Sequence, residues 1–213
     1  MFSGKLHTLL RLLRNDRKSL LTILSGKRKR LFVYVSSTDS AQPLTDLAGA
    51  QFRALSDADL LAISSNSFDG TGYDEAFRNH QKRCLQTFGR SYAYGVYMDG
   101  ALAHISWMLP PEALSKEYPL VLNLAKDEAE ITVCETLEQF RGRRIYPYAI
   151  QKLLETGRRS GIRKIYMKTD SDNTASQAGI QKAGLKRIGT VTLLVPPAMP
   201  ARVLVRRRLK ESQ

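Results

Sequence analysis

Apolar residues follow two different spacings along this chain, and the switch between them predicts the order of its elements. Helical spacing predicts helices over residues 57–65, 73–88, 147–160 and 174–183; alternating or continuous apolar runs predict strands over 31–35, 51–55, 92–98, 101–108, 129–137, 163–169, 187–195 and 202–209. Asp99-Gly100, between two of these strands, is a strong hairpin signal. A helical pair, an antiparallel hairpin and a β-α-β-α-β unit together predict an α+β domain, in which helices flank a central mixed sheet.

Composition divides the chain into three stretches. Residues 1–30 resemble a basic amphipathic helix with one leucine stripe, residues 31–50 a strand and a polar linker, and residues 51–213 the main domain. The leucine stripe suits packing against the domain or against a second subunit, so the sequence is also compatible with a homodimer. It equally suits a partner protein, an anionic membrane surface or a targeting function. The leucines of the stripe are Leu6, Leu9, Leu10, Leu13, Leu20, Leu21 and Leu24.

The positive charge of the chain is concentrated at its two ends. The net charge is +13, of which residues 1–30 carry +8 and residues 201–213 carry +4, so residues 31–200 carry +1. A nearly neutral body argues against nucleic acid as the partner, although binding driven by the ends alone remains an alternative.

The cysteines and the lengths of the apolar runs indicate the cellular compartment in which we expect the protein. Cys84 and Cys134 stand far apart without a neighbouring histidine, which predicts neither a disulfide nor a metal site and fits a reducing cytoplasm. No apolar run approaches the ~20 residues that span a bilayer. We therefore expect a cytoplasmic protein, peripheral at the inner face of the membrane if residues 1–30 attach there.

A basic loop separates the strand at 129–137 from the next helix. It reads Arg-Gly-Arg-Arg-Ile-Tyr over residues 141–146, and Pro147 after it suits the first position of a helix. Backbone N–H groups at a helix start bind phosphate groups, and arginine pairs with phosphate in bidentate fashion. The loop therefore predicts a site for a diphosphate group.

Residues 51–209 resemble the GNAT acyltransferase superfamily. Phe140 to Tyr146 stand in the frame of its Arg/Gln-x-x-Gly-x-Gly/Ala motif, and Asn173-x-x-Ser176 with Lys182-Ala183-Gly184-Leu185 resemble its Asn-x-x-Ser…Lys-x-Gly-Phe ending. A weaker similarity is to small bacterial GNAT proteins of surface-polysaccharide gene clusters. The resemblance implies an acetyl-CoA-dependent N-acyltransferase, which moves an acetyl group to an amine of a small-molecule or sugar-like acceptor by direct attack on the thioester.

Three positions depart from the family pattern. Arg144 and Tyr146 replace its two glycines, and Ile180 replaces the tyrosine that protonates the leaving thiolate. Tyr148, Tyr166 or water are candidates for that acid, whose loss is a handicap of about 10²–10⁴-fold. These departures keep a second interpretation open, a catalytically degenerate GNAT domain that serves as a CoA-binding or regulatory module.

The resemblance places the reaction on the strand at 129–137, where main-chain groups face the pantetheine and a backbone N–H stabilises the oxyanion. Alternation along a strand predicts Glu130, Thr132, Cys134 and Thr136 on one face. Glu130 is then the preferred base, with Glu135 and Glu128 behind it. Asn173 is equally well explained as a helix N-cap. The residues expected to bind the cofactor are Cys134, Thr136, Arg141, Gly142, Arg143, Arg144, Ile145, Tyr146, Asn173 and Ser176, and no metal is expected.

Overall fold

A computed structural model of the protein describes residues 29–37, 46–64, 75–115, 121–194 and 203–210. Most of the predicted basic helix, residues 1–28, lies outside the described residues. So do residues 38–45 of the predicted linker and the loop expected at 67–72.

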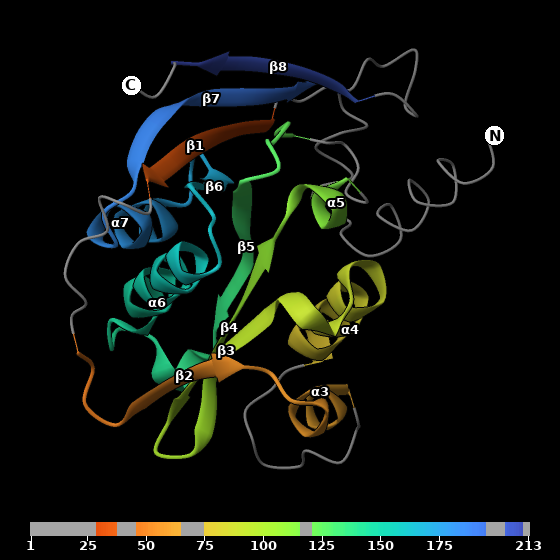
Figure 1. The fold of residues 1–213 in the computed structure, drawn as a ribbon. Coiled ribbons are helices and arrows are strands. Elements are labelled where there is room, and N and C mark those ends of the chain that lie inside the picture. The colour runs from red at the N-terminus through yellow and green to blue at the C-terminus, as the bar shows by residue number, and fades with distance from the viewer. Residues whose placement is uncertain (1–28, 38–45, 65–74, 116–120, 195–202, 211–213) are drawn as a thin grey trace.

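Helices flank a mixed sheet, so the predicted fold class is confirmed (Figure 1). The strands are β1 (Lys29–Ser37), β2 (Ala50–Ala54), β3 (Ala93–Met98), β4 (Ala101–Leu109), β5 (Glu128–Thr136), β6 (Lys164–Asp170), β7 (Lys186–Leu194) and β8 (Leu204–Leu209). The helices are α3 (Asp57–Ser64), α4 (Glu75–Phe88), α5 (Pro111–Leu114), α6 (Ile145–Arg159) and α7 (Thr174–Lys182), with 3-10 turns at Arg90–Tyr92 and Glu138–Phe140. Helix α5 lies in a stretch that the apolar pattern left as a connection.

The eight strands form one sheet in the order β2-β3-β4-β5-β6-β1-β7-β8. Strands β5 and β6 are parallel neighbours, as a β-α-β unit requires, and every other neighbouring pair is antiparallel. Strand β1 lies between β6 and β7, hydrogen-bonded to both. Residues 29–37, set apart in the sequence as the end of the extension and the start of a linker segment, are therefore an interior strand of the sheet.

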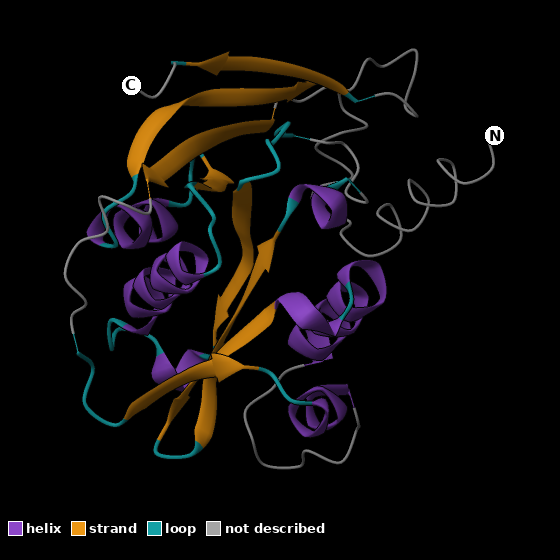
Figure 2. Cartoon of the chain, viewed as in Figure 1, coloured by secondary structure: helices purple, strands orange, loops and turns teal. Residues whose placement is uncertain are grey.

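Helices cover the sheet from both sides (Figure 2). Helices α6 and α7 pack on one face over Ile131, Ile165 and Met167, and helices α4 and α5 pack on the other over Trp107 and Leu109. We call these the α6 face and the α4 face. Strand β5, on which the family resemblance places the reaction, lies near the middle of the sheet, with a helical layer on each side.

Helix α6 begins two residues earlier than predicted. Arg144 is its N-cap and Ile145 its first residue, so Pro147 occupies the third helical position and not the first. Proline is still tolerated there, because the N–H groups of the first helical turn have no carbonyl partner within the helix.

Candidate functional site

Strand β5 leaves its parallel neighbour halfway along its length. Pairing with β6 runs from Glu128 opposite Lys164 to Ile131 opposite Met167. Beyond that point β5 still pairs with β4, but in the described chain it has no strand on the β6 side. The strand pair is therefore splayed over residues 132–136.

A β-bulge at Val133 corrects the predicted facing of the side chains on β5. Val133 has φ 49, and the register with β4 shifts between Thr132, opposite Trp107, and Glu135, opposite Ile105. Because a bulge puts two consecutive side chains on one face, alternation breaks there. Glu130 and Thr132 lie on the α4 face, whereas Cys134 and Thr136 lie on the α6 face. The prediction that all four share one face is wrong.

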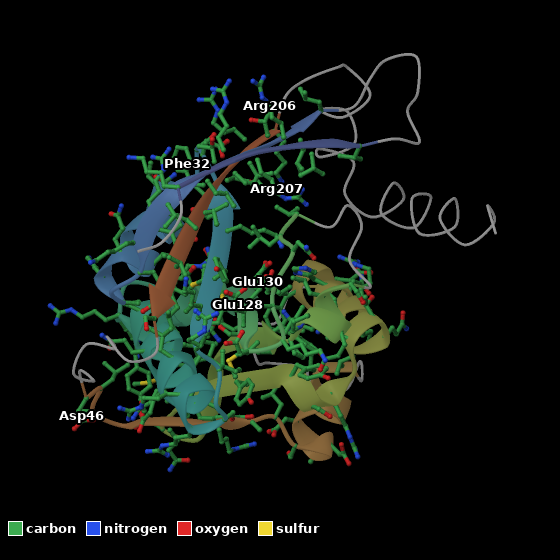
Figure 3. The ribbon with its side chains drawn as sticks, turned by 45° about the horizontal axis from the view of Figure 1, so that its top comes forward. Phe32, Asp46, Glu128, Glu130, Arg206 and Arg207 are labelled. Carbon is green, nitrogen blue, oxygen red and sulfur yellow. The ribbon has the colours of Figure 1, made fainter. Side chains whose placement is uncertain are left out.

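The preferred base, Glu130, is fully buried. Its side chain has no exposed surface, and Lys168 Nζ donates to its Oε1 at 2.5 Å. Glu128 lies two residues before Glu130 on the same face of β5, and Figure 3 labels both side chains. Glu128 Oε1 accepts from the Tyr166 hydroxyl at 3.2 Å. Burial raises the pKa of Tyr166 to about 12, and the Glu128 carboxylate adds to this rise. Glu128 and Glu130 are therefore hydrogen-bonded within the part of β5 that pairs with β6, outside the splayed segment.

Glu135 differs from Glu130 because it lies in the splayed segment and its side chain is about one-third exposed. Gln81 Nε2 donates to Glu135 Oε2 at 3.1 Å, and His80 Nδ1 lies 3.5 Å from the same oxygen. Trp107 Nε1 in turn donates to Gln81 Oε1 at 3.0 Å, which fixes the Gln81 amide. The α4 face therefore presents a carboxylate beside an imidazole at the splay.

Sequence reasoning missed His80 and Gln81. They are more than fifty residues from Glu135, so nothing along the chain links them to it. One signal was present: Gln81 stands on the same helical stripe as Phe77, Cys84 and Phe88, and all four are buried. A polar residue on an apolar stripe requires a hydrogen-bond partner, which here comes from β4 and β5.

A buried polar chain lies on the α6 face of the splay. His104 Nδ1 is 2.7 Å from Thr136 Oγ1, and Nε2 is 2.6 Å from Ser106 Oγ. Ser106 also hydrogen-bonds to the Cys134 thiol, whose pKa burial raises to about 12. Burial lowers the pKa of His104 to about 3, so the imidazole is neutral. Cys134 is accordingly a thiol and not a reactive thiolate near neutral pH.

The basic loop keeps the backbone shape of a glycine-containing turn. Gly142 has φ 79 and Arg144 has φ 60, ψ 15, with Arg143 between them outside the positive-φ region. Alternation of this kind arranges N–H groups around a concavity that suits an anion. Arg144 is exposed and provides no side-chain cap for α6. The first-turn N–H groups at Ile145 and Tyr146 therefore have neither a helical carbonyl nor a cap to bind.

The side chains of the other two arginines in the loop, Arg141 and Arg143, contact residues close to them in the sequence. Arg141 Nε donates to the Thr136 carbonyl at 3.2 Å, which ties the loop to the end of β5. The Arg143 guanidinium lies 5.6 Å from the centre of the Phe140 ring. All three arginines are exposed, so their charges are available to a ligand at the start of α6.

Tyr146 lies between α6 and α7. Its hydroxyl is 3.1 Å from Ser176 Oγ, and its ring packs on Gly179 so closely that a Cβ there would come within 2.4 Å of it. Asn173 caps α7 by accepting from the Ser176 N–H at 3.0 Å. Ile180 is fully buried, so the family's tyrosine position carries no acid here. Of the candidate replacements, Tyr148 is buried in another cluster, and Tyr166 lies on the α4 face with its hydroxyl bonded to Glu128.

Fold and site together define the architecture of an acyltransferase, with a splayed parallel strand pair beside a basic helix start. Residues 58–185, more than half of the chain, match the family model described as "Acetyltransferase (GNAT) family". The chain therefore belongs to the GNAT acetyltransferase family. No curated protein sequence matches it significantly.

Solved structures with the same fold include GNAT acetyltransferases. A GNAT-family acetyltransferase from Colwellia psychrerythraea has a TM-score of 0.52 at 14% identity, covering 76% of this chain and 53% of that one. A GCN5-related N-acetyltransferase from Sphaerobacter thermophilus has a TM-score of 0.52 at 12% identity, and the match covers 82% of this chain and 54% of that one. A third structure is the GCN5-related glucosamine N-acetyltransferase region of a fungal multi-domain GH3 β-N-acetylglucosaminidase. Its TM-score is 0.57 at 11% identity, and the match covers 76% of this chain and 20% of that one. This chain thus spans about half of the first two proteins, and the likeness is one of fold.

None of the helices in the described ranges combines the length and apolar character needed to cross a bilayer.

Proposed function

We propose that this chain transfers an acetyl group from acetyl-CoA to an amine of a small-molecule or sugar-like acceptor, such as a surface-polysaccharide precursor. The observation that carries the proposal is the start of α6, where Arg144 holds a left-handed conformation at φ 60. A non-glycine residue in that region is strained, and such strain concentrates at ligand-binding sites. The turn thus keeps its shape although the glycine is gone.

The residues around this turn fit a diphosphate. The free N–H groups of Ile145 and Tyr146 and the exposed cations of Arg141, Arg143 and Arg144 would bind the coenzyme's phosphates. The pantetheine would then follow the splayed part of β5 past Cys134 and Thr136. Acetyl-CoA supplies an activated acyl group as a thioester.

The α4 face supplies the base in this proposal. An amine that enters from that side meets Glu135, with His80 beside it, and loses its proton to the carboxylate directly or through a water molecule. Glu130 is the weaker candidate because its carboxylate is buried and bonded to Lys168. A β5 backbone N–H near the bulge would stabilise the oxyanion as the amine attacks the carbonyl carbon.

The bond between carbon and sulfur then breaks, and the thiolate takes a proton. Tyr146 is the proposed donor. Its hydroxyl contacts Ser176 on α7, one helical turn before Ile180, which occupies the position of the family's tyrosine. Burial raises the pKa of Tyr146, which keeps the phenol protonated at neutral pH but makes it a weaker acid than a free phenol.

Calorimetric titration with coenzyme A and acetyl-CoA tests the proposal. We expect saturable binding by the wild type and a loss of at least about tenfold in Arg144→Ala, since a hydrogen bond to a charged group contributes about 1.5–3 kcal/mol. Arg158→Ala, an exposed arginine at the opposite end of α6, is the matched control and should bind as the wild type does. Absence of binding at millimolar coenzyme would overturn the proposal.

For the location, we propose the cytoplasm, with residues 1–30 attached peripherally to the inner face of the membrane. The support is the leucine stripe and the charge of +8 in that segment. A full-length chain should sediment with anionic vesicles more strongly than a chain without residues 1–28. Equal sedimentation of the two chains would dismiss a role for that segment.

A further inference from the structure

The sheet brings the two basic ends of the chain side by side. Across β1, β7 and β8, Arg30 is opposite Thr192, which is opposite Arg206. In the next row Phe32 is opposite Thr190, which is opposite Arg208. Directly opposed residues share a face of the sheet. Arg30, Arg206 and Arg208 therefore project from one face, although they come from opposite ends of the sequence.

A fourth arginine joins this face. Arg187 is opposite Tyr34, two residues along β1 from Phe32, and its guanidinium lies 3.3 Å from the centre of the Phe32 ring. The ring is half-buried and the guanidinium is exposed. We call Arg30, Arg187, Arg206 and Arg208 the arginine face.

The charges of the arginine face are not neutralised within the described residues. Strands β1, β7 and β8 contain no carboxylate, and no described acidic side chain forms an ion pair with any of the four arginines. The opposite side of the same strands differs. There Lys29 pairs with Asp170 at 3.1 Å, and Arg207 Nε donates to the Val121 carbonyl at 2.7 Å. Figure 3 shows Arg206 and Arg207 leaving β8 on opposite sides.

Protection of an exposed sheet edge does not account for the arginine face. Charged residues on an edge strand prevent pairing with another sheet, which would explain Arg206 and Arg208 on β8. Arg30 and Arg187, however, belong to β1 and β7, which have neighbours on both sides. The cluster therefore requires another explanation.

We propose that the arginine face binds an anionic phospholipid surface. Its cations are spread over three strands about 4.8 Å apart, which presents guanidinium groups to several headgroup phosphates at once. The segment that leads into β1 is basic and carries the leucine stripe of residues 6–24. An apolar stripe suits a lipid surface and has no use on a nucleic acid, so charge and apolar pattern together favour the membrane.

This inference refines the membrane attachment proposed for residues 1–30, and the test separates the two. Full-length wild type and the Arg206→Gln/Arg208→Gln variant are sedimented with vesicles of phosphatidylcholine alone or with phosphatidylglycerol added. We expect affinity for the anionic vesicles to fall about fivefold per arginine, hence roughly 25-fold for the pair. Lys126→Gln/Arg158→Gln, which removes two exposed cations elsewhere, is the matched control and should fall less than threefold.

Three results would overturn the inference. Equal losses in both variants would show that only net charge matters. Unchanged vesicle binding in Arg206→Gln/Arg208→Gln would leave residues 1–30 as the sole attachment. A loss of duplex-DNA binding in that variant, measured by fluorescence anisotropy while vesicle binding persists, would assign the face to nucleic acid. Matching unfolding midpoints confirm that the variants are folded.

Discussion

His104 couples the stability of the core to pH. Its pKa is lowered by burial from about 6.5 in an unfolded chain to about 3 in the fold. Between these two pKa values the unfolded state binds a proton at His104 and the folded state does not. The free energy of unfolding is therefore highest above pH 6.5 and decreases as the pH falls toward 3. We expect the free energy of unfolding to drop by about 2 kcal/mol between pH 7 and pH 5 from this residue alone.

Urea unfolding of wild type and His104→Gln at both pH values measures this contribution. The variant has no imidazole to protonate, so its free energy of unfolding should depend less on pH in that window. Parallel losses in the two proteins would mean that His104 is not held neutral.

The two candidate bases on β5 should respond differently to the same substitution. Glu130→Gln leaves Lys168 without its buried charged partner, which should cost about 3–5 kcal/mol of stability. Glu135→Gln keeps a hydrogen-bonding group at a partly exposed site, so stability should change little while kcat falls about 10²–10⁴-fold. Unfolding curves and initial rates of acetyl transfer separate the two effects. Full activity in Glu135→Gln would remove it as the base.

Tyr146 and Gly179 should behave as a coupled pair. A Cβ at position 179 would overlap the Tyr146 ring, so Gly179→Ala should destabilise the wild type by about 1–3 kcal/mol. In a Tyr146→Ala background the same change should be neutral or stabilising, because alanine favours a helix over glycine by about 1 kcal/mol. A double-mutant cycle from chemical unfolding measures the coupling. Additive effects would contradict the contact.

At the scale of elements, the start of α6 combines backbone strain at Arg144 with the proposed coenzyme site. Arg144→Gly should raise the free energy of unfolding by roughly 0.5–1 kcal/mol, because it removes a left-handed strain of about 1–2 kcal/mol but adds entropy to the unfolded chain. It should also weaken coenzyme binding by removing a cation. Arg144→Ala is the control that removes the cation and retains the strain. A lower unfolding midpoint in Arg144→Gly than in Arg144→Ala would contradict this account.

Most elements could be predicted because their signals are local. The apolar spacing of Ala149, Ile150, Leu153 and Leu154 indicates α6, and Asp99-Gly100 indicates the β3–β4 hairpin. The bulge at Val133 had no such signal, since valine is a common strand residue that rarely adopts positive φ. One shifted residue moved Glu130 and Cys134 to opposite faces, and the predicted arrangement of the site failed there.

At the scale of the whole molecule, β1 ties the N-terminal segment into the sheet. Its backbone pairs with β6 on one side and β7 on the other, and Val33 and Tyr34 are fully buried. Amide hydrogen exchange should therefore find the β1 amides protected to nearly the free energy of global unfolding. The edge strand β8, with one neighbour, should exchange faster. Exchange of β1 at the rate of β8 would show that β1 is loosely held.

The sequence by itself determined the α+β class, the family resemblance, the basic loop before α6 and the concentration of positive charge at both ends. Those features depend on residues close together in the chain, where spacing and dihedral preferences act directly. Only the tertiary structure decided that β1 lies inside the sheet, that His80 and Gln81 meet Glu135, and that Arg30 shares a face with Arg206. These contacts join distant residues through strand order and register, which the packing of the whole sheet selects.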